Sequence, residues 1–359
     1  MLNFQDLPDE LVLRILSYSE TKDLITYDQV SKSNWIKMSN FHDLPDELIL
    51  KIISYSETKV LVICGQVSKR IRRISHDATL WVMANLEKKI VKTELLEMIL
   101  RKGCKILNLR NSVILGKMNL NIKSQLRVLK LSRPQFNIHC QCNVDCYCDF
   151  KENTGVLGKL LSSCCSLQHL VMEGVLVTSK MAKSICKNGK TLQTLNLICS
   201  DLNGLILNEI ISSCQELKEV DLAYVNYGEG IEDVDLEFLA KNITPNVEKL
   251  NLTGISQDPE FNDYCFEILL RRCNKIKVLS LEATCITDNL LSNIRQCLVY
   301  TLEELSLGPC DEITYSGFLE LKSMPRLKIL NIHYNKVNNQ EIQNLKRLLP
   351  HVMIKVSHE

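Results

Sequence analysis

The sequence lacks several features that define large classes of protein. Its 359 residues contain nothing close to the run of about 20 apolar residues that spans a bilayer. The N-terminus, MLNFQDLPDE, is acidic and amphipathic, which is unlike a secretory signal. The 43 Lys and Arg residues nearly balance the 42 Asp and Glu residues, and a net charge of +1 argues against nucleic-acid binding over a broad surface. We therefore expect a soluble globular protein with no membrane or nucleic-acid partner.

Signs of catalysis are also missing. The chain has no glycine-rich loop that would cradle a phosphate, and no Ser, His and Asp set placed on loops. We expect no catalytic residues, no cofactor and no enzyme activity. The 16 cysteines fall short of the density of a secreted disulfide scaffold. We expect reduced thiols, many of them buried as small hydrophobic side chains.

The chain contains two kinds of internal repeat, of which the shorter lies at the N-terminus. NFQDLPDELVLRILSYSETKDLITYDQVSK (3–32) and NFHDLPDELILKIISYSETKVLVICGQVSK (40–69) are identical at 21 of 30 positions. Only the second copy continues, through VSKRIRRISHDATLW to Trp81. The first copy therefore lacks the last third of the unit.

Each copy predicts a short amphipathic helix. In the second copy Pro45 stands where a helix can begin, and Asp46 and Glu47 place negative charge near the positive end of the helix dipole. Apolar residues at helical spacing share one face, namely Leu44, Leu48 and Ile52, widened by Ile49 and Ile53.

The longer repeat fills the rest of the chain. The pattern L-x-x-L-x-L, or a close variant, predicts strands within ten segments: 104–109, 126–131, 167–172, 192–197, 217–222, 247–252, 276–281, 302–307, 327–332 and 352–357. Amphipathic helices are predicted between them, and several end at a cysteine, namely Cys164, Cys214 and Cys273. One such unit cannot bury its apolar face alone, so the units stack. We predict an α/β fold in which a three-helix module precedes a curved solenoid, with a parallel sheet on the concave face and helices outside.

The residues LPDEL, the QVSKR turn and the terminal LW make 41–81 resemble an F-box. With cysteine-containing leucine-rich repeats following, the chain resembles the F-box/leucine-rich-repeat family. The resemblance implies four segments: a truncated duplicate of the F-box (1–39), the F-box (40–85), a linker helix (86–103) and a solenoid of about ten strands (104–359) with a Cys-rich insertion at 134–153.

The resemblance also implies a function. It is that of the substrate-recognition subunit of an SCF-type cullin-RING E3 ubiquitin ligase, which docks the Skp adaptor through the F-box. The repeats would present a protein substrate, with a cell-cycle regulator as one candidate, in the nucleus and cytoplasm. Carried over by position, the adaptor-binding residues are Phe41, Leu44, Pro45, Leu48, Ile52, Ile53, Val67 and Trp81.

Two alternatives stay open at this point. The chain could be a leucine-rich-repeat binding or scaffold protein without ligase association, which adaptor binding would distinguish. The first copy, residues 1–39, could bind a second adaptor, exchange with the complete F-box, be disordered, or have no function.

Residues that alternate with the strand leucines are expected on the concave face, where solenoids bind partners. Acidic residues outnumber basic ones there, which favours a basic partner. The residues expected to bind a substrate or accessory protein are Glu173, Glu219, Asp221, Tyr224, Asn251, Glu282, Glu304 and His333. In one family member an aromatic residue at the Tyr224 position serves a Cks accessory protein. Pro309 stands where that member carries a basic residue, and its C-terminal tail has no counterpart here, so use of a Cks protein stays open.

HCQCNVDCYC (139–148) gathers four cysteines in ten residues. Four thiolates can hold zinc, but C-x-C-x3-C-x-C is not a usual zinc-finger spacing. We interpret the segment as a surface loop and expect no metal site; the residues that would form one are Cys140, Cys142, Cys146 and Cys148.

Overall fold

The computed structural model describes residues 44–56, 58–118, 123–132, 150–225, 232–255 and 259–356. Several sequence predictions lie outside these residues: those on the first copy and Phe41, and those on Cys140, Cys142, Cys146 and Cys148. Across the described ranges, no group of three or more His, Cys, Asp or Glu side chains is placed to hold a metal ion. No described helix combines the length and the apolar character needed to cross a membrane.

The first described module consists of three short helices, α4 (Asp46–Ser54), α5 (Thr58–Val67) and α6 (Lys69–Ser75), and the 3-10 helix η3 (Ala78–Trp81). Side chains cap two of these elements. Ser68 accepts a hydrogen bond from the backbone N–H of Ile71, and Asp77 accepts one from that of Thr79. The buried core of the module includes Ile49, Ile53, Leu61, Ile71, Ile74 and Trp81.

A solenoid of strand–helix repeats follows. Within the described ranges, eleven strands form one parallel sheet in chain order: β1 (Met83–Asn85), β3 (Ile106–Leu109), β5 (Val128–Ser132), β6 (His169–Glu173), β7 (Thr194–Asn196), β8 (Glu219–Asp221), β9 (Lys249–Asn251), β10 (Val278–Ser280), β11 (Glu304–Ser306), β12 (Ile329–Asn331) and β13 (Met353–Lys355). The central leucines of neighbouring strands stand opposite one another, as Leu250, Leu279 and Leu305 do. Two more described strands, β2 (Ile90–Lys92) and β4 (Val113–Leu115), form a separate pair.

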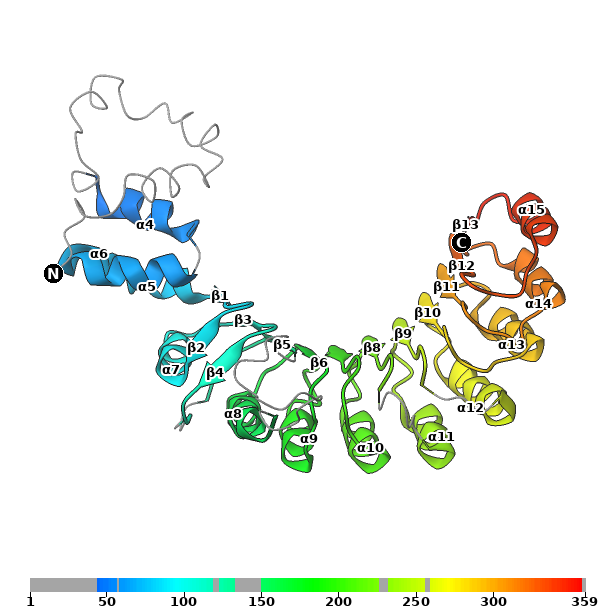
Figure 1. The fold of residues 1–359 in the computed structure, drawn as a ribbon, viewed down its shortest axis with the longest axis horizontal. Coiled ribbons are helices and arrows are strands. Elements are labelled where there is room, and N and C mark those ends of the chain that lie inside the picture. Colours follow the sequence, from blue (N-terminus) through cyan, green and yellow to red (C-terminus); the bar gives the residue numbers. More distant parts are fainter. Residues whose placement is uncertain are drawn as a thin grey trace, which may run out of the picture.

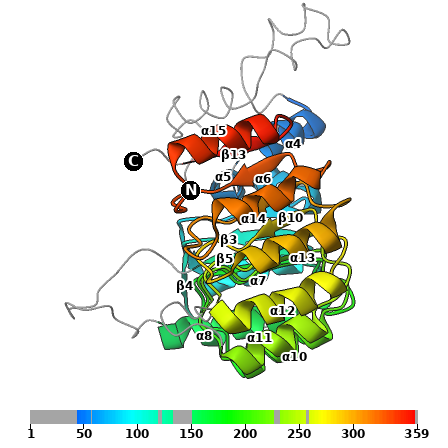
Figure 2. The same ribbon diagram turned by 90° about the vertical axis from the view of Figure 1, so that its right-hand side faces the viewer.

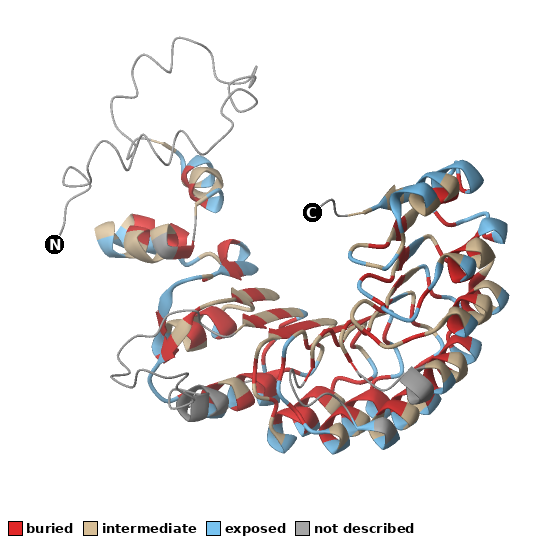
Figure 3. Ribbon diagram, turned by 45° about the vertical axis from the view of Figure 1, so that its right-hand side comes forward, coloured by how far each residue is buried: buried red, intermediate tan, exposed pale blue. Residues whose placement is uncertain are grey.

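The helices form a second layer on the outer side of the arc (Figure 1). They are α7 (Thr93–Arg101), α8 (Phe150–Ser163), α9 (Ser179–Cys186), α10 (Gly204–Ser213), α11 (Asp233–Asn242), α12 (Pro259–Arg272), α13 (Asp288–Leu298), α14 (Tyr315–Leu319) with the 3-10 helix η5 (Glu320–Ser323), and α15 (Asn339–Leu348). Figure 2 shows α10 to α15 stacked one above another. Buried residues lie between the two layers, and exposed residues lie on the outer helix faces (Figure 3). The predicted architecture is confirmed, and each of the ten predicted segments overlaps a described strand.

The structure corrects the predicted boundary between the module and the solenoid. The sheet begins at β1, because Met83 pairs with Ile106, and residues 86–103 hold β2 and α7 and are therefore more than a linker helix. In this register Trp81 occupies the position that Cys104 fills in the next strand. Trp81 is thus both the last residue of η3 and the first apolar residue of the first repeat, so no linker separates the two parts.

Buried cysteines close several repeats, as the sequence predicted. Cys214 follows α10 and Cys273 follows α12, and burial raises the pKa of both thiols to about 12. The Cys273 thiol also donates to the carbonyl of Thr244 in the preceding repeat, with a sulfur–oxygen distance of 3.5 Å. These thiols are protonated packing groups that link neighbouring repeats. Every cysteine in the described ranges is a free thiol.

Candidate protein-binding surfaces

Helix α4 has one buried edge and one exposed apolar edge. Ile49 and Ile53 are buried, whereas Leu48 is 39% exposed and Tyr55 is 53% exposed. Leu44 and Ile52 are half-buried and continue the exposed edge at helical spacing. We call the residues Leu44, Leu48, Ile52 and Tyr55 the α4 ridge.

Arginine side chains from α6 clamp the start of α4. Arg70 Nε donates to Asp46 Oδ1 at 2.7 Å, and Arg70 Nη2 donates to the carbonyl of Leu44 at 2.6 Å. Arg73 donates to the other carboxylate oxygen of Asp46. The hydrogen bond from Arg70, followed by that from Arg73, lowers the pKa of Asp46 below its ordinary value. From the sequence, Asp46 was expected only to interact with the helix dipole, although the two arginines three residues apart at 70 and 73 were a usable signal for this pairing.

The predicted adaptor residues divide into two groups. Pro45 and Leu48 are exposed, and Leu44, Ile52 and Val67 are half-buried. Ile53 and Trp81, also predicted for the adaptor face, lie in the core of the module, where each is only 1% exposed. Trp81 Nε1 donates to the carbonyl of Ser75 at 2.7 Å inside the core. Both residues shape the module from within.

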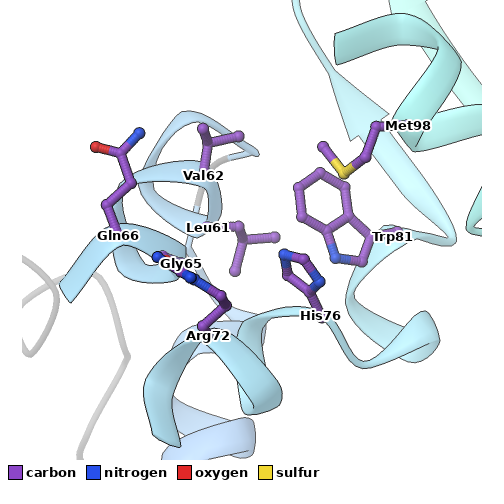
Figure 4. A pocket seen from close by; sticks show the side chains of 8 residues that line it. All are labelled: Leu61, Val62, Gly65, Gln66, Arg72, His76, Trp81 and Met98. Carbon is purple, nitrogen blue, oxygen red and sulfur yellow. The ribbon is translucent and has the colours of Figure 1, made fainter. Parts of the chain in front are cut away.

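A pocket of about 230 Å³, which the sequence did not indicate, lies where the module meets the first repeat. Figure 4 shows its lining, which comes from α5, α6, η3 and α7: Leu61, Val62, Gly65, Gln66, Arg72, His76, Trp81 and Met98. Beside it, Lys102 Nζ donates to the carbonyl of His76 at 3.0 Å and lies 5.6 Å from the Trp81 ring centroid. Burial, followed by the charges of Lys102 and Arg72, lowers the pKa of His76. The joint is therefore apolar inside, with basic groups around it.

The concave face is built from one turn that recurs where the strands end. A side-chain oxygen accepts the backbone N–H two residues later at 3.1 to 3.3 Å in six described repeats, at Asn85, Asn108, Asn196, Asp221, Asn251 and Asn331. One residue further on, the backbone is left-handed in eight described repeats, at Lys88, Asn111, Gly174, Cys199, Tyr224, Gly254, Ala283 and Tyr334. Asp221 and Asn251, predicted as binding residues, therefore also shape the turns.

Partners within the sheet occupy much of the predicted acidic face. Arg110 pairs with Glu173, and Lys249 Nζ lies 2.7 Å from Glu219 Oε1. Asn331 Nδ2 donates to Glu282 Oε1 at 2.7 Å. Burial raises the pKa of Asp221 even though the N–H of Ala223 donates to it. Glu304 remains exposed. The acidic character available to a partner therefore lies toward the C-terminal repeats.

The predicted aromatic anchor is less exposed than expected. Tyr224 is half-buried, and its ring covers Gly254, where an added Cβ would lie 2.5 Å from Tyr224 Cδ1. Tyr334, at the equivalent turn position of a later repeat, is 74% exposed beside His333. Sequence analysis did not single out Tyr334, although it follows Asn331 as Tyr224 follows Asp221. Pro309 fills this turn position in the repeat of β11.

Comparison with protein families agrees with this geometry. The family described as the SKP2 LRR domain matches residues 94–358, which is most of the chain. The chain belongs to the F-box/leucine-rich-repeat family. Within it, the repeats resemble those of SKP2, S-phase kinase-associated protein 2. An F-box-like model matches residues 41–86, and an F-box domain model matches residues 4–33 in the first copy.

Membership of the F-box/leucine-rich-repeat family carries a general function. F-box domains bind the Skp adaptor and through it cullin-RING ligases. An F-box joined to SKP2-like repeats is the arrangement of an SCF substrate receptor, and such domains are typical of non-catalytic recognition subunits.

Proposed function

We propose that this chain docks the Skp adaptor through the α4 ridge and presents a protein substrate on its concave face for ubiquitination. The ridge carries the proposal. The clamp from α6 and the buried edge hold α4 in place, while Leu48 and Tyr55 stay exposed. An ordered helix with an apolar outer edge is suited to a partner's apolar groove.

The joint between module and solenoid supports the second half of the proposal. Because Trp81 belongs to both parts, an adaptor bound at α4 also fixes the orientation of the concave face. A substrate receptor of this kind acts by proximity and orientation, with the covalent step on other subunits. The rigid joint is what such positioning requires.

For the substrate side, we propose contacts at the C-terminal end of the concave face. Glu304, at the start of β11, and Tyr334, in the turn after β12, are exposed there. Glu282 and His333 lie in the turns that follow β10 and β12. An exposed carboxylate and an exposed aromatic side chain on one face favour a partner segment that carries a basic and an apolar group. A cell-cycle regulator is the candidate substrate, and a Cks protein is the candidate accessory partner.

Co-elution of the full chain with purified Skp adaptor in size-exclusion chromatography tests the proposal. The wild-type chain should form a stable complex. A variant with Leu11→Asp and Leu48→Asp, which changes the ridge position in both copies, should lose it. Leu205→Asp is the matched control, because Leu205 is 78% exposed on the outer helix α10 and its change should leave the complex intact. If the wild-type chain fails to bind, the chain is a scaffold protein without ligase association. If the ridge variant binds as the wild type does, the α4 ridge is not the docking surface.

A further inference from the structure

The two F-box copies have diverged unevenly along their length. Residues 7–18 match 44–55, which contain α4, at 9 of 12 positions, and the three differences are conservative. Residues 21–30 match 58–67, which form α5, at only 5 of 10 positions. The segment of the first copy that corresponds to α4 is therefore the part of the sequence that has been retained.

Changes at the α5 positions conflict with the packing seen in the complete module. Cys64 is buried, and the first copy has Tyr27 in its place. An added Cβ on Gly65 would already lie 3.3 Å from the Ser75 hydroxyl, and the first copy has Asp28 there. A larger ring and a charge at two tightly packed positions do not fit this helix pair.

The residues of α6 that hold α4 have no equivalents in the first copy. Ser33 and Ile36 stand where the complete module has the clamping arginines Arg70 and Arg73. Asn34 and Lys37 stand in place of the two buried isoleucines of α6, Ile71 and Ile74. The first copy thus has no equivalent of the α6 surface on which α4 packs, and we call that surface the platform.

By contrast, each group through which α4 contacts the platform has a counterpart in the first copy. Asp9 matches the clamped carboxylate of Asp46, and Val12 and Leu16 match the buried Ile49 and Ile53. The outward ridge is repeated without change, as Leu7, Leu11, Ile15 and Tyr18.

We propose that residues 7–18 are an alternative occupant of the single platform and exchange there with residues 44–55. Either occupant presents the same ridge, so the chain binds one adaptor molecule. This inference rests on the proposed docking of the adaptor at α4.

Chain length permits the exchange. Between Tyr18 and Thr58 lie 39 residues, and a random coil of that length has an average span of about 35 Å. Helix α4, with 9 residues, is only about 14 Å long. The tether also keeps the first copy at an effective concentration in the millimolar range. Val12 has one buried methyl group fewer than Ile49, which makes the first copy the weaker occupant by about tenfold.

Binding of the adaptor to full-chain variants, measured by isothermal titration calorimetry, tests the exchange. Ile49→Asp removes α4 from the platform, and we expect binding to weaken by at most about tenfold while the stoichiometry stays at one, because the first copy then presents the ridge. Val12→Asp alone should change the affinity less than twofold, and the double variant should lose more than a hundredfold. Loss of all binding in Ile49→Asp alone, or two adaptors per wild-type chain, would overturn the proposal.

Hydrogen exchange of the variants, measured without the adaptor, tests the exchange of the two segments independently of adaptor binding. In Ile49→Asp the amides of α5 and α6 should stay protected, because the first copy seats on them, and in the double variant that protection should be lost. Unchanged protection in β9 to β11 shows that the solenoid of each variant is folded. Equal loss of protection in the single and double variants would refute the exchange even if the adaptor binds elsewhere.

Discussion

Trp81 gives the sharpest prediction about how the two parts of the chain are joined. Its side chain is 1% exposed, its indole N–H donates to Ser75, and it stands in register with Cys104 of the sheet. Replacing a fully buried Trp by Ala costs about 3–5 kcal/mol. If Trp81 belongs to both parts, Trp81→Ala should loosen the F-box module and the first repeat together.

Native-state hydrogen exchange measures this directly. A loss of about 3–5 kcal/mol raises the opening constant by roughly two to four orders of magnitude. We expect faster exchange in α4, α5, α6, β1 and α7, and unchanged exchange in β9 to β11, because each repeat contacts only its neighbours. The matched control is Phe266→Ala, which removes a 1% exposed ring from α12 and should act on α11, α12 and α13 but leave the module unchanged. Faster exchange in the module alone, with β1 and α7 unaffected, would refute the shared joint.

Three further predictions follow from single side chains. Gly254→Ala forces a side chain onto a backbone with φ of 63° and into the Tyr224 ring. It should destabilise the chain by about 1–3 kcal/mol in urea unfolding, and Tyr224→Ala should recover part of that loss. Folding raises the pKa of Asp221, so its ionised carboxylate destabilises the folded state. The free energy of unfolding therefore falls as the pH rises from the unfolded-state pKa to the folded-state pKa. Asp221→Asn should therefore be at least as stable as wild type at pH 7, with the advantage gone below about pH 4; a variant less stable at pH 7 would contradict the sign. Cys214 and Cys273, with thiol pKa values of about 12, should resist alkylation at pH 8 long after the exposed Cys165 has reacted; mass spectrometry showing equal labelling would contradict this.

The repeated strands were predictable because burial on the core side imposes leucine at fixed spacing. The first strand escaped this pattern because Ala84 takes the central position and Trp81 the first, so the segment reads as the end of an F-box. A periodic pattern of leucines is recognised only where leucines are present. In the first strand the small Ala84 and the indole of Trp81 occupy the buried positions that leucines occupy in other repeats.

Side-chain partners far apart in the sequence could not be predicted in the same way. The sequence indicates that Glu173 faces the concave side, but its pairing with Arg110 depends on how the intervening strand places two turns. The burial of Ile53 likewise depends on where α6 packs. The 3.6-residue period of α4 carries no information about that packing. One apolar face on a helix wheel became a buried edge and a ridge once a neighbouring helix was in place.

Direct contact between the α4 ridge and the adaptor is the central claim, and site-specific photocrosslinking tests it most directly. A photoreactive phenylalanine is placed at position 48 in the full chain, and in a second sample at position 205 on the outer surface of α10. After illumination with the Skp adaptor, we expect a covalent adduct from position 48 and none from position 205. An adduct only from position 205, or equal adducts from both, would contradict docking through α4.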